Sequence, residues 1–436
     1  MNVNEMNRFL ALGELNHLGL FPRLENLSLQ PLKFEVDFGL KNLPKQPGFI
    51  SIRGPRQFGK STWLEGQLRT SALENGPASS FYLNGDELTS HQDLSEKIRE
   101  LLAAFSPKAK LKRLFIDEIT TVDKWETSIK RLADAGEIRD LLIVTTGSKA
   151  LDLRRGHERL PGRKGKLERT QYIFTPMSYK IFERHAKPIF GAQSWKAYLL
   201  TGGSPIAASE LIINKKIPEY LVTLTREWIQ GEVAAADRSR STLKKILQII
   251  FRAGGTPFGY SSLARDAGLA NNTVAQGYVQ LLQDLMVVAP GFRYDHNKKV
   301  SIARFPCQFR FTNTLVALSW YDQQMRTIDD FDSLKETEQA KFLEWLVAQE
   351  LFRRSAIASG DLAESLDYWQ SPDHELDFVI DDSHFIEVKR GQTSALEFSW
   401  FSKVFGRQAK LQVIGTSKFE GLQTRGVTID EFLLGL

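Results

Sequence analysis

The stretch GPRQFGKS, residues 54–61, decides how the rest of this chain is interpreted. Directly before it, residues 49–52 form a short apolar run that predicts a strand. Directly after it, residues 62–68 predict the first turns of a helix. The sequence therefore predicts a glycine-rich loop that joins a buried strand to a helix.

This loop fits the pattern G-x-x-x-x-G-K-[ST], whose backbone N–H groups surround the phosphates of a nucleotide. The helix that follows adds a partial positive charge at its N-terminus. Lys60 is predicted to reach the β- and γ-phosphates, and the Ser61 hydroxyl to bind Mg²⁺. The predicted phosphate-binding residues are Gly54, Pro55, Arg56, Gln57, Phe58, Gly59, Lys60, Ser61 and Thr62.

Two later strands are predicted to end in polar side chains that complete this site. The apolar run 114–118 ends in Asp117, predicted to hold Mg²⁺ through water, and Glu118, predicted to act as the general base. The run 141–148 predicts a buried strand whose end brings Thr146 or Ser148 beside the γ-phosphate. Simple turn chemistry at Gly147–Ser148 is the open alternative.

Composition is ordinary for a globular protein, with 42% hydrophobic and 25% charged residues among 436. The single cysteine, Cys307, argues against a disulfide framework, and we expect a cytoplasmic protein. Neither a signal peptide nor a membrane span is expected. The net charge of +5 is compatible with a nucleic-acid partner without indicating one.

A basic stretch follows the strand 141–148. It carries one long run of cations: Arg154, Arg155, Arg159, Arg163, Lys164, Lys166 and Arg169. Three interpretations stay open: a solvated surface, a contact with phosphate or DNA backbone, and an arginine that stabilises γ-phosphate charge in cis or from a neighbouring subunit.

Taken together, several segments resemble the archaeal-type ATPase family, a P-loop group within the AAA+/STAND branch. The segments are GPRQFGKS, FIDEI, VTTGS, LRRGHERLPGR, the PMSY segment and TGGSP. The resemblance implies ATP and Mg²⁺ as cofactors. It also implies that Pro205, in a Gly-x-Pro turn, lies near adenine, and that Arg163 is a sensor or finger arginine. Ser61 stands where many members have threonine, and either hydroxyl serves Mg²⁺.

Residues 216–325 are predicted to be mainly helical and resemble a winged helix-turn-helix. Helices are expected over 260–269 and 272–286, with a wing formed by strands 287–289 and 300–305. The second helix presents polar side chains able to contact bases: Asn272, Thr273, Gln276, Gln280 and Gln283. A packing or signalling module is the open alternative.

Residues 326–436 resemble a PD-(D/E)xK nuclease, with a helix over 337–353 and strands over 366–370, 375–380 and 385–389. Asp377 and Glu387 are predicted to hold Mg²⁺, completed by Glu344, while Lys389 positions water or stabilises the phosphate. The alternative is a degenerate nuclease-like fold in which this cluster is structural.

Alternating strands and helices predict an α/β fold with a parallel sheet, followed by a helical and a second α/β domain. The expected domains are an N-terminal helical segment at 1–45 with a helix over 7–18, an ATPase domain at 46–215, a winged-helix domain at 216–325 and a nuclease-like domain at 326–436.

The predicted function is Mg²⁺-dependent ATP binding and hydrolysis, used as a switch for the winged-helix and nuclease-like domains. The alternatives are an ATP-regulated nuclease and a non-hydrolysing, DNA-binding sensor. The predicted partners are ATP and DNA or another nucleic acid, with a homo-oligomer or protein partner also open and no membrane.

Overall fold

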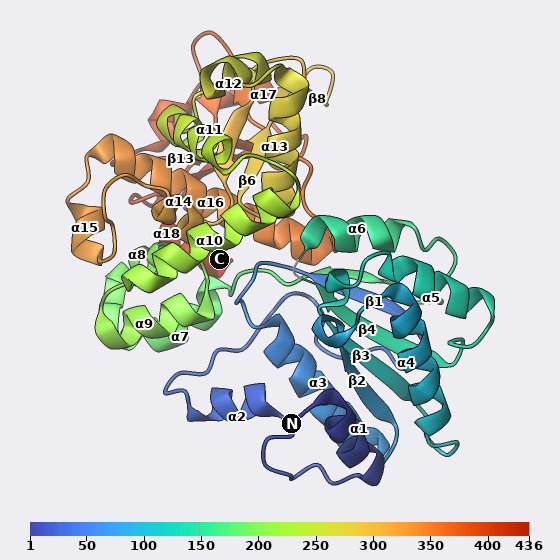
Figure 1. The fold of residues 1–436 in the computed structure, drawn as a ribbon. Coiled ribbons are helices and arrows are strands. Elements are labelled where there is room, and N and C mark those ends of the chain that lie inside the picture. The colour runs from blue at the N-terminus through green and yellow to red at the C-terminus, as the bar shows by residue number, and fades with distance from the viewer. Residues whose placement is uncertain (148, 436) are drawn as a thin grey trace. The chain divides into compact units, whose positions relative to one another are not determined.

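The structure is a computed structural model that describes residues 1–147 and 149–435. The chain forms two compact units (Figure 1). The first contains residues 1–175 and 356–361, and the second contains residues 176–355 and 362–435. The finer division into four domains stays a prediction.

The first unit is built on a five-stranded sheet in which every neighbouring pair is parallel, which confirms the predicted α/β class. The strand order is β2-β3-β4-β1-β5. Every residue of β4 is buried, as expected for a strand covered on both faces. The strands are β1 (Gly48–Arg53), β2 (Ser80–Asn84), β3 (Lys112–Asp117), β4 (Leu141–Gly147) and β5 (Gln171–Ile173).

Helices cover both faces of this sheet. Figure 1 shows α3 (Lys60–Asn75) on one face and α4 (His91–Ala104) with α5 (Trp125–Asp134) on the other. Leu64 and Leu68 of α3 are fully buried, and the burial of each side chain stabilises the fold by about 1.5–3 kcal/mol. A short helix, α6 (Ala150–Glu158), follows β4, and 3-10 turns η1 (Gly85–Glu87) and η2 (Ile119–Thr121) follow β2 and β3.

The N-terminal segment packs on this unit, as predicted. Its first helix, α1 (Val3–Leu12), lies earlier than the expected 7–18, because Gly13 ends it with a φ of 76°. The Asn7 amide donates to the Tyr82 carbonyl at 2.8 Å and accepts from the Tyr82 N–H at 2.9 Å, so it satisfies the edge of β2. The second helix is α2 (Pro22–Leu29).

The second unit begins with four helices: α7 (Tyr179–Phe190), α8 (Ser194–Thr201), α9 (Pro205–Asn214) and α10 (Glu219–Ala235). The 3-10 turn η3 (Gly191–Gln193) joins the first two. Gly202 and Gly203 have φ of 54° and 72°, and Ser204 caps α9, which starts at Pro205. The predicted Gly-Gly-x-Pro turn is confirmed.

The two helices predicted to form a helix-turn-helix follow, but the strands after them pair differently from the prediction. Strand β6 pairs with β9, and the hairpin that carries Lys298 and Lys299 is β7–β8. The predicted pairing of 287–289 with 300–305 is wrong, because residues 288–291 instead pair with 308–311. The elements are α11 (Arg240–Ala253), α12 (Tyr260–Ala267), α13 (Asn272–Asp284), β6 (Val288–Gly291), β7 (Arg293–Asp295), β8 (Val300–Ile302) and β9 (Gln308–Phe311).

The last part of the chain forms a mixed five-stranded sheet in the order β12-β13-β14-β16-β15. Residues 395–405 form a 3-10 turn followed by a short α-helix. The elements are α14 (Thr314–Ser319), α15 (Ile328–Asp332), α16 (Glu336–Ser359), β10 (Trp369–Gln370), β11 (Glu375–Leu376), β12 (Phe378–Val379), β13 (His384–Val388), η4 (Ala395–Phe398), α17 (Phe401–Phe405), β14 (Lys410–Gly415), β15 (Phe419–Glu420), β16 (Thr424–Thr428) and α18 (Ile429–Leu434). Within the described ranges, no helix is both long and apolar enough to cross a bilayer.

A buried histidine in the first unit makes folding sensitive to acid. His157 is 1% exposed, and its ring nitrogens lie 2.9 Å from Ser51 Oγ and 3.1 Å from Thr170 Oγ1. Burial lowers its pKa to about 3 from the ordinary value of 6.5. The unfolded chain therefore binds one more proton than the folded chain between these two pH values.

We expect the free energy of unfolding to fall as the pH drops from 6.5 towards 3, by up to about 1.4 kcal/mol per pH unit from His157 alone. The variant His157→Gln should lose this part of the slope, measured by denaturant unfolding across that range. His17→Gln, at an exposed position, is the control and should keep the wild-type slope. Equal slopes in wild type and His157→Gln would contradict the assignment.

Candidate functional site

The phosphate loop joins β1 to α3, as the sequence predicts. Gln57 and Gly59 adopt left-handed backbone conformations, with φ of 64° and 100°. Successive turns of this kind direct backbone N–H groups into one concavity that suits an anion. A Cβ on Gly54 would lie 2.5 Å from the Phe174 carbonyl oxygen, so only glycine fits there.

Lys60 begins α3 and lies over the loop. It is 5% exposed, and its ammonium donates to the carbonyl oxygens of Gly54 at 3.0 Å and Pro55 at 2.8 Å. These contacts hold the positive charge beside the N–H groups that would surround a phosphate.

Asp117 ends β3 at the same edge of the sheet and is 1% exposed. The Ser61 hydroxyl donates to its Oδ1 at 3.1 Å, and the Thr146 hydroxyl donates to the same oxygen. Its Oδ2 accepts from the Tyr82 hydroxyl at 3.5 Å and pairs with the Arg23 guanidinium at 3.2 Å. The carboxylate therefore connects β2, β4, α2 and α3.

These residues fit a magnesium ion. Mg²⁺ prefers hydroxyl, carboxylate and water oxygens, and Ser61 Oγ and Asp117 Oδ1 lie side by side. The structure brings together the two side chains predicted for this role.

Glu118 follows Asp117 and adopts a left-handed backbone conformation, with φ of 49° and ψ of 42°. Its N–H donates to Thr146 Oγ1 at 3.2 Å, and a Cβ on Gly85 would lie 2.2 Å from its carbonyl oxygen. A non-glycine residue held left-handed costs about 1 kcal/mol or more and often marks a functional position. Of the two hydroxyl candidates, Thr146 reaches the site, and Ser148 lies outside the described residues.

Sequence reasoning missed three side chains around Asp117: Arg23, Tyr82 and Glu65. Glu65 is 2% exposed, and burial raises its pKa although Leu24 N–H and Arg23 oppose the rise. Burial lowers the pKa of Arg23, but Tyr82, Asp117 and Glu65 outweigh it and raise the pKa overall. No local pattern marks these residues, because their partners are distant in sequence.

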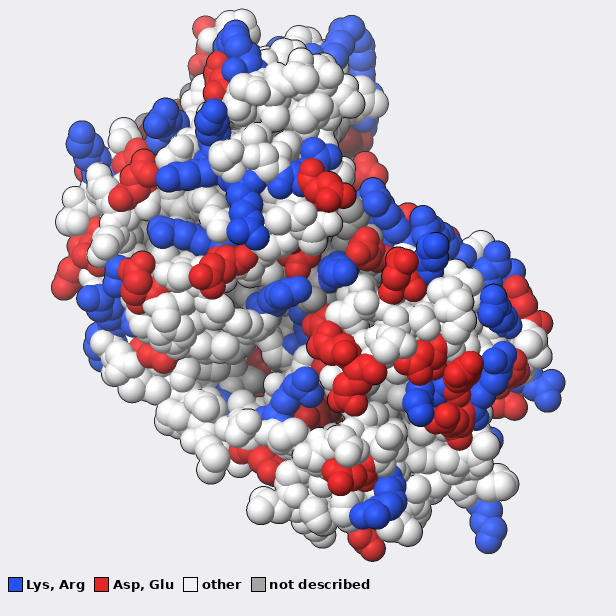
Figure 2. Space-filling model, in the orientation of Figure 1, with Lys and Arg blue, Asp and Glu red and all other residues white. Residues whose placement is uncertain are grey.

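Much of the basic stretch is neutralised within the chain. Arg163 binds Asp134 with two nitrogens, at 2.6 and 3.1 Å, and Arg159 binds Glu126 at 2.5 Å. Arg169 donates to the Ile357 carbonyl at 2.8 Å. Figure 2 shows acidic and basic side chains interspersed on the visible face. The finger role of Arg163 stays a prediction.

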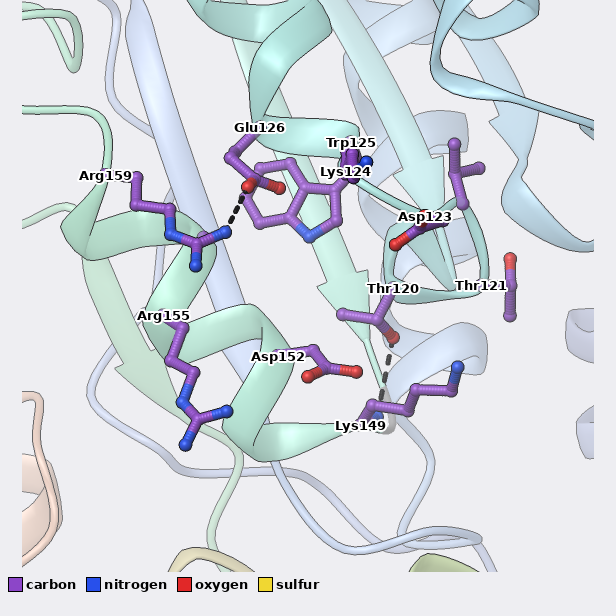
Figure 3. Close-up of a pocket in the computed structure, with 12 residues that line it drawn as sticks. Thr120, Thr121, Asp123, Lys124, Trp125, Glu126, Lys149, Asp152, Arg155 and Arg159 are labelled. Atoms are coloured by element: carbon purple, nitrogen blue, oxygen red, sulfur yellow. Dashed lines mark hydrogen bonds and ion pairs between the residues drawn. The ribbon is translucent and has the colours of Figure 1, made fainter. Parts of the chain in front are cut away.

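A pocket of about 200 Å³ lies between η2, α5 and α6 (Figure 3). Trp125 and the ion pair of Glu126 with Arg159 form one side, and Lys149 and Asp152 form another. No residue of the phosphate loop lines it, so it is not the phosphate site.

In the second unit, α13 presents most of the predicted base-contacting residues to solvent. Asn272, Thr273, Gln276 and Gln280 are exposed. Gln283 is buried, and its amide donates to the carbonyls of residues 363 and 364, so its predicted base contact is wrong. Lys299, in the turn between β7 and β8, pairs with Asp382 at 3.2 Å.

Of the residues predicted to form a nuclease-like site, Asp377, Glu387 and Lys389 lie together. Glu387 Oε2 accepts from the Asp377 N–H at 3.3 Å, and Asp377 Oδ2 accepts from the Val388 N–H at 2.7 Å. Lys389 forms an ion pair with Glu387. Burial raises the pKa of Asp377 and Glu387, and for Glu387 the charge of Asp377 adds to the rise.

Glu344 is held by a different partner. Arg310 of β9 is fully buried and donates to Glu344 at 2.6 Å and to the Asp377 carbonyl at 2.7 Å. Gln308 of the same strand donates to Glu375 at 2.5 Å. Across residues 1–147 and 149–435, no three His, Cys, Asp or Glu side chains form a group that could hold a metal. A metal site at Glu344, Asp377 and Glu387 stays a prediction.

Comparison with protein families defines the class. Residues 46–182 match the AAA domain family, a match that contains the phosphate loop, Asp117, Glu118 and Thr146. Residues 46–182 therefore form a P-loop ATPase domain of the AAA type, and such a domain implies nucleotide binding, typically with magnesium. Residues 192–310 match a domain of unknown function. The narrower archaeal-type placement stays a prediction, as does the adenine contact of Pro205, which lies in the second unit.

A comparison with curated proteins finds no match. Among solved structures, a Walker-type ATPase of Pyrococcus abyssi is similar at 13% identity and a TM-score of 0.44, over 69% of this chain and 94% of that one. The ORC1 protein of Aeropyrum pernix in complex with DNA is similar at 13% identity and a TM-score of 0.32, over 73% and 91%. A RuvB variant of Thermotoga maritima is similar at 18% identity and a TM-score of 0.29, over 56% and 81%. Likenesses this slight say nothing about what the present chain binds.

The backbone of Glu118 gives a test that is separate from catalysis. Asparagine adopts the left-handed conformation more readily than glutamate. We expect Glu118→Asn to raise the free energy of unfolding by about 0.5–1 kcal/mol, measured by denaturant unfolding. The control Glu87→Asn, at an exposed position without positive φ, should give no gain. A lower unfolding midpoint for Glu118→Asn would contradict a strained backbone.

Proposed function

We propose that this protein hydrolyses ATP with magnesium and uses the nucleotide as a switch for its winged-helix and nuclease-like parts. The observation that carries the proposal is the meeting of Lys60, Ser61, Asp117, Glu118 and Thr146 at one edge of the parallel sheet. These side chains come from two different strand ends and one helix start, so their convergence is a product of the fold rather than of one local motif.

Each of these groups has a distinct role in the proposed reaction. The loop N–H groups and Lys60 bind the phosphates and offset their charge. Ser61 and Asp117 would hold Mg²⁺, which neutralises charge on the β- and γ-phosphates when bound. Glu118 accepts the proton of the attacking water, while Thr146 fixes the positions of Asp117 and the Glu118 backbone. Pro205 beside adenine and Arg163 as a charge-stabilising arginine, in cis or from a second copy, belong to the same proposal.

Two substitutions separate nucleotide binding from hydrolysis. Lys60→Ala should weaken ATP binding at least tenfold, because it removes the one lysine charge beside the phosphates. Glu118→Gln should keep binding and lower phosphate release by about 10²–10⁴-fold, the usual contribution of a general base. Binding is measured by calorimetry and hydrolysis by phosphate release.

Lys130→Ala, at an exposed position on α5, is the charge-matched control and should behave as wild type. Unchanged phosphate release in both Lys60→Ala and Glu118→Gln would sink the proposed assignment of this site.

A second candidate function is nuclease action licensed by ATP. The observation that favours it is the cluster of Asp377, Glu387 and Lys389 on paired strands, in which two buried acids repel each other and so favour a cation between them. Against it stands Arg310, which already neutralises Glu344. A third candidate is a DNA-binding sensor, favoured by the exposed polar side chains of α13.

One experiment distinguishes these candidates. Wild type and Asp377→Asn are incubated with single- and double-stranded DNA and RNA, with Mg²⁺ or Mn²⁺, with and without ATP. A nuclease predicts cleavage by wild type and its loss, by at least 10²-fold, in Asp377→Asn, with ATP hydrolysis retained. Asp381→Asn, a carboxylate in an exposed turn, is the control and should cleave normally.

The same mixtures run on native gels test the sensor. An ATP-dependent shift without cleavage would favour a DNA-binding sensor. Neither cleavage nor a shift under any condition would remove the nucleic-acid part of the proposal and leave the ATPase alone.

A further inference from the structure

The N-terminal segment reaches the nucleotide site through one side chain, Arg23. One guanidinium nitrogen lies 3.2 Å from Asp117 Oδ2, and another lies 3.6 Å from Glu65 Oε2. This arginine belongs to none of the motifs that define the phosphate site. It is 41% exposed, whereas both acids are almost completely buried.

Polar contacts contribute to holding α2, the helix that carries Arg23. None of the residues of α2 is buried, although Phe21, just before it, is 4% exposed. The Leu24 N–H donates to Glu65 Oε1 at 3.0 Å, beside the ion pairs of Arg23. Leu24 of α2 also packs, partly buried, against the core. The position of α2 on α3 therefore depends in part on two acids, Glu65 and Asp117.

The two oxygens of Asp117 face different partners. Oδ1 faces Ser61 and Thr146, on the side where a magnesium ion would lie, and Oδ2 faces Arg23 and Tyr82. A cation at Oδ2 withdraws charge from the carboxylate and repels a second cation at Oδ1. Ser61 and Thr146 already orient the carboxylate, so this repulsion is the main effect of Arg23 on a bound metal.

We propose that Arg23 is the resident counter-ion of Asp117, and that magnesium bound with a nucleotide competes with it for this carboxylate. Arg23 thereby sets the magnesium concentration at which the nucleotide binds. The inference rests on the proposed role of Asp117 as the magnesium acid.

The size of the effect follows from Coulomb's law. A dication and a monocation about 6 Å apart repel each other by about 1.4 kcal/mol in a water-like dielectric, which is a factor of about ten in affinity. Removing the charge of Arg23 should therefore lower the magnesium requirement about tenfold, and keeping the charge as lysine should leave it close to the parent value.

The test uses the full chain with Glu118→Gln, so that no turnover interferes. Binding of a fluorescent ATP analogue is titrated with Mg²⁺. Arg23→Gln should lower the half-saturating Mg²⁺ concentration about tenfold, and Arg23→Lys should stay within about twofold of the parent. Arg8→Gln, an exposed arginine of α1, controls for general loss of positive charge and should not change it. An unchanged or higher magnesium requirement in Arg23→Gln overturns the inference.

A second measurement needs no substitution at Arg23 and covers the case in which that variant does not fold. Hydrogen exchange of residues 19–29 in the Glu118→Gln chain should rise with ATP and Mg²⁺, because competition for Asp117 loosens α2, and should not rise with ATP and EDTA. Equal exchange in both mixtures overturns the inference. If the parent binds the nucleotide without any dependence on Mg²⁺, the proposed role of Asp117 fails instead.

Discussion

A buried carboxylate is the constraint on which the first unit depends. The Asp117 side chain is almost completely removed from water, so each of its oxygens needs a hydrogen-bond donor or a cation. Its partners come from α3, β4, β2 and the N-terminal segment, four parts of the chain that only the complete fold brings together. The same contacts therefore satisfy the Asp117 carboxylate and assemble the proposed magnesium site.

The parallel sheet explains why chemistry gathers at this edge. Parallel strands end on the same side, and the loops after β1, β3 and β4 therefore meet there. The register pairs Ile52 with Thr146 and Ile116 with Thr145, which sets the ends of the three strands level with one another. The left-handed backbone of Glu118 then turns the chain sharply after Asp117, and Gly85 leaves room for this turn. A larger residue at Gly85 would displace Glu118 from this position.

The parts of the site that the sequence predicted are those marked by local patterns. The loop, the strand ending at Asp117 and the strand ending beyond Thr146 each show their own apolar run, so their positions follow from short-range rules. Arg23 and Arg310 could not be predicted in this way, because a lone arginine looks the same whether it is solvated or paired with a distant acid. The predicted pairing of residues 287–289 with 300–305 is wrong for a related reason: β6 and β7 follow each other closely, and only tertiary pairing shows which of them forms the hairpin with β8. Gln283 shows that a polar side chain on a helix can donate a hydrogen bond to a neighbouring loop instead of facing solvent.

The buried position of Arg310 has a consequence for how the second unit can be inherited. Its guanidinium comes from β9, yet its partners Glu344 and the Asp377 carbonyl belong to residues 326–436, which follow β9 in the sequence. A gene fragment that encoded only residues 326–436 would contain this acid without the arginine that neutralises it. Recombination at a boundary between β9 and α16 would break this buried ion pair, so the segments on either side of it are expected to pass from ancestor to descendant as a single module.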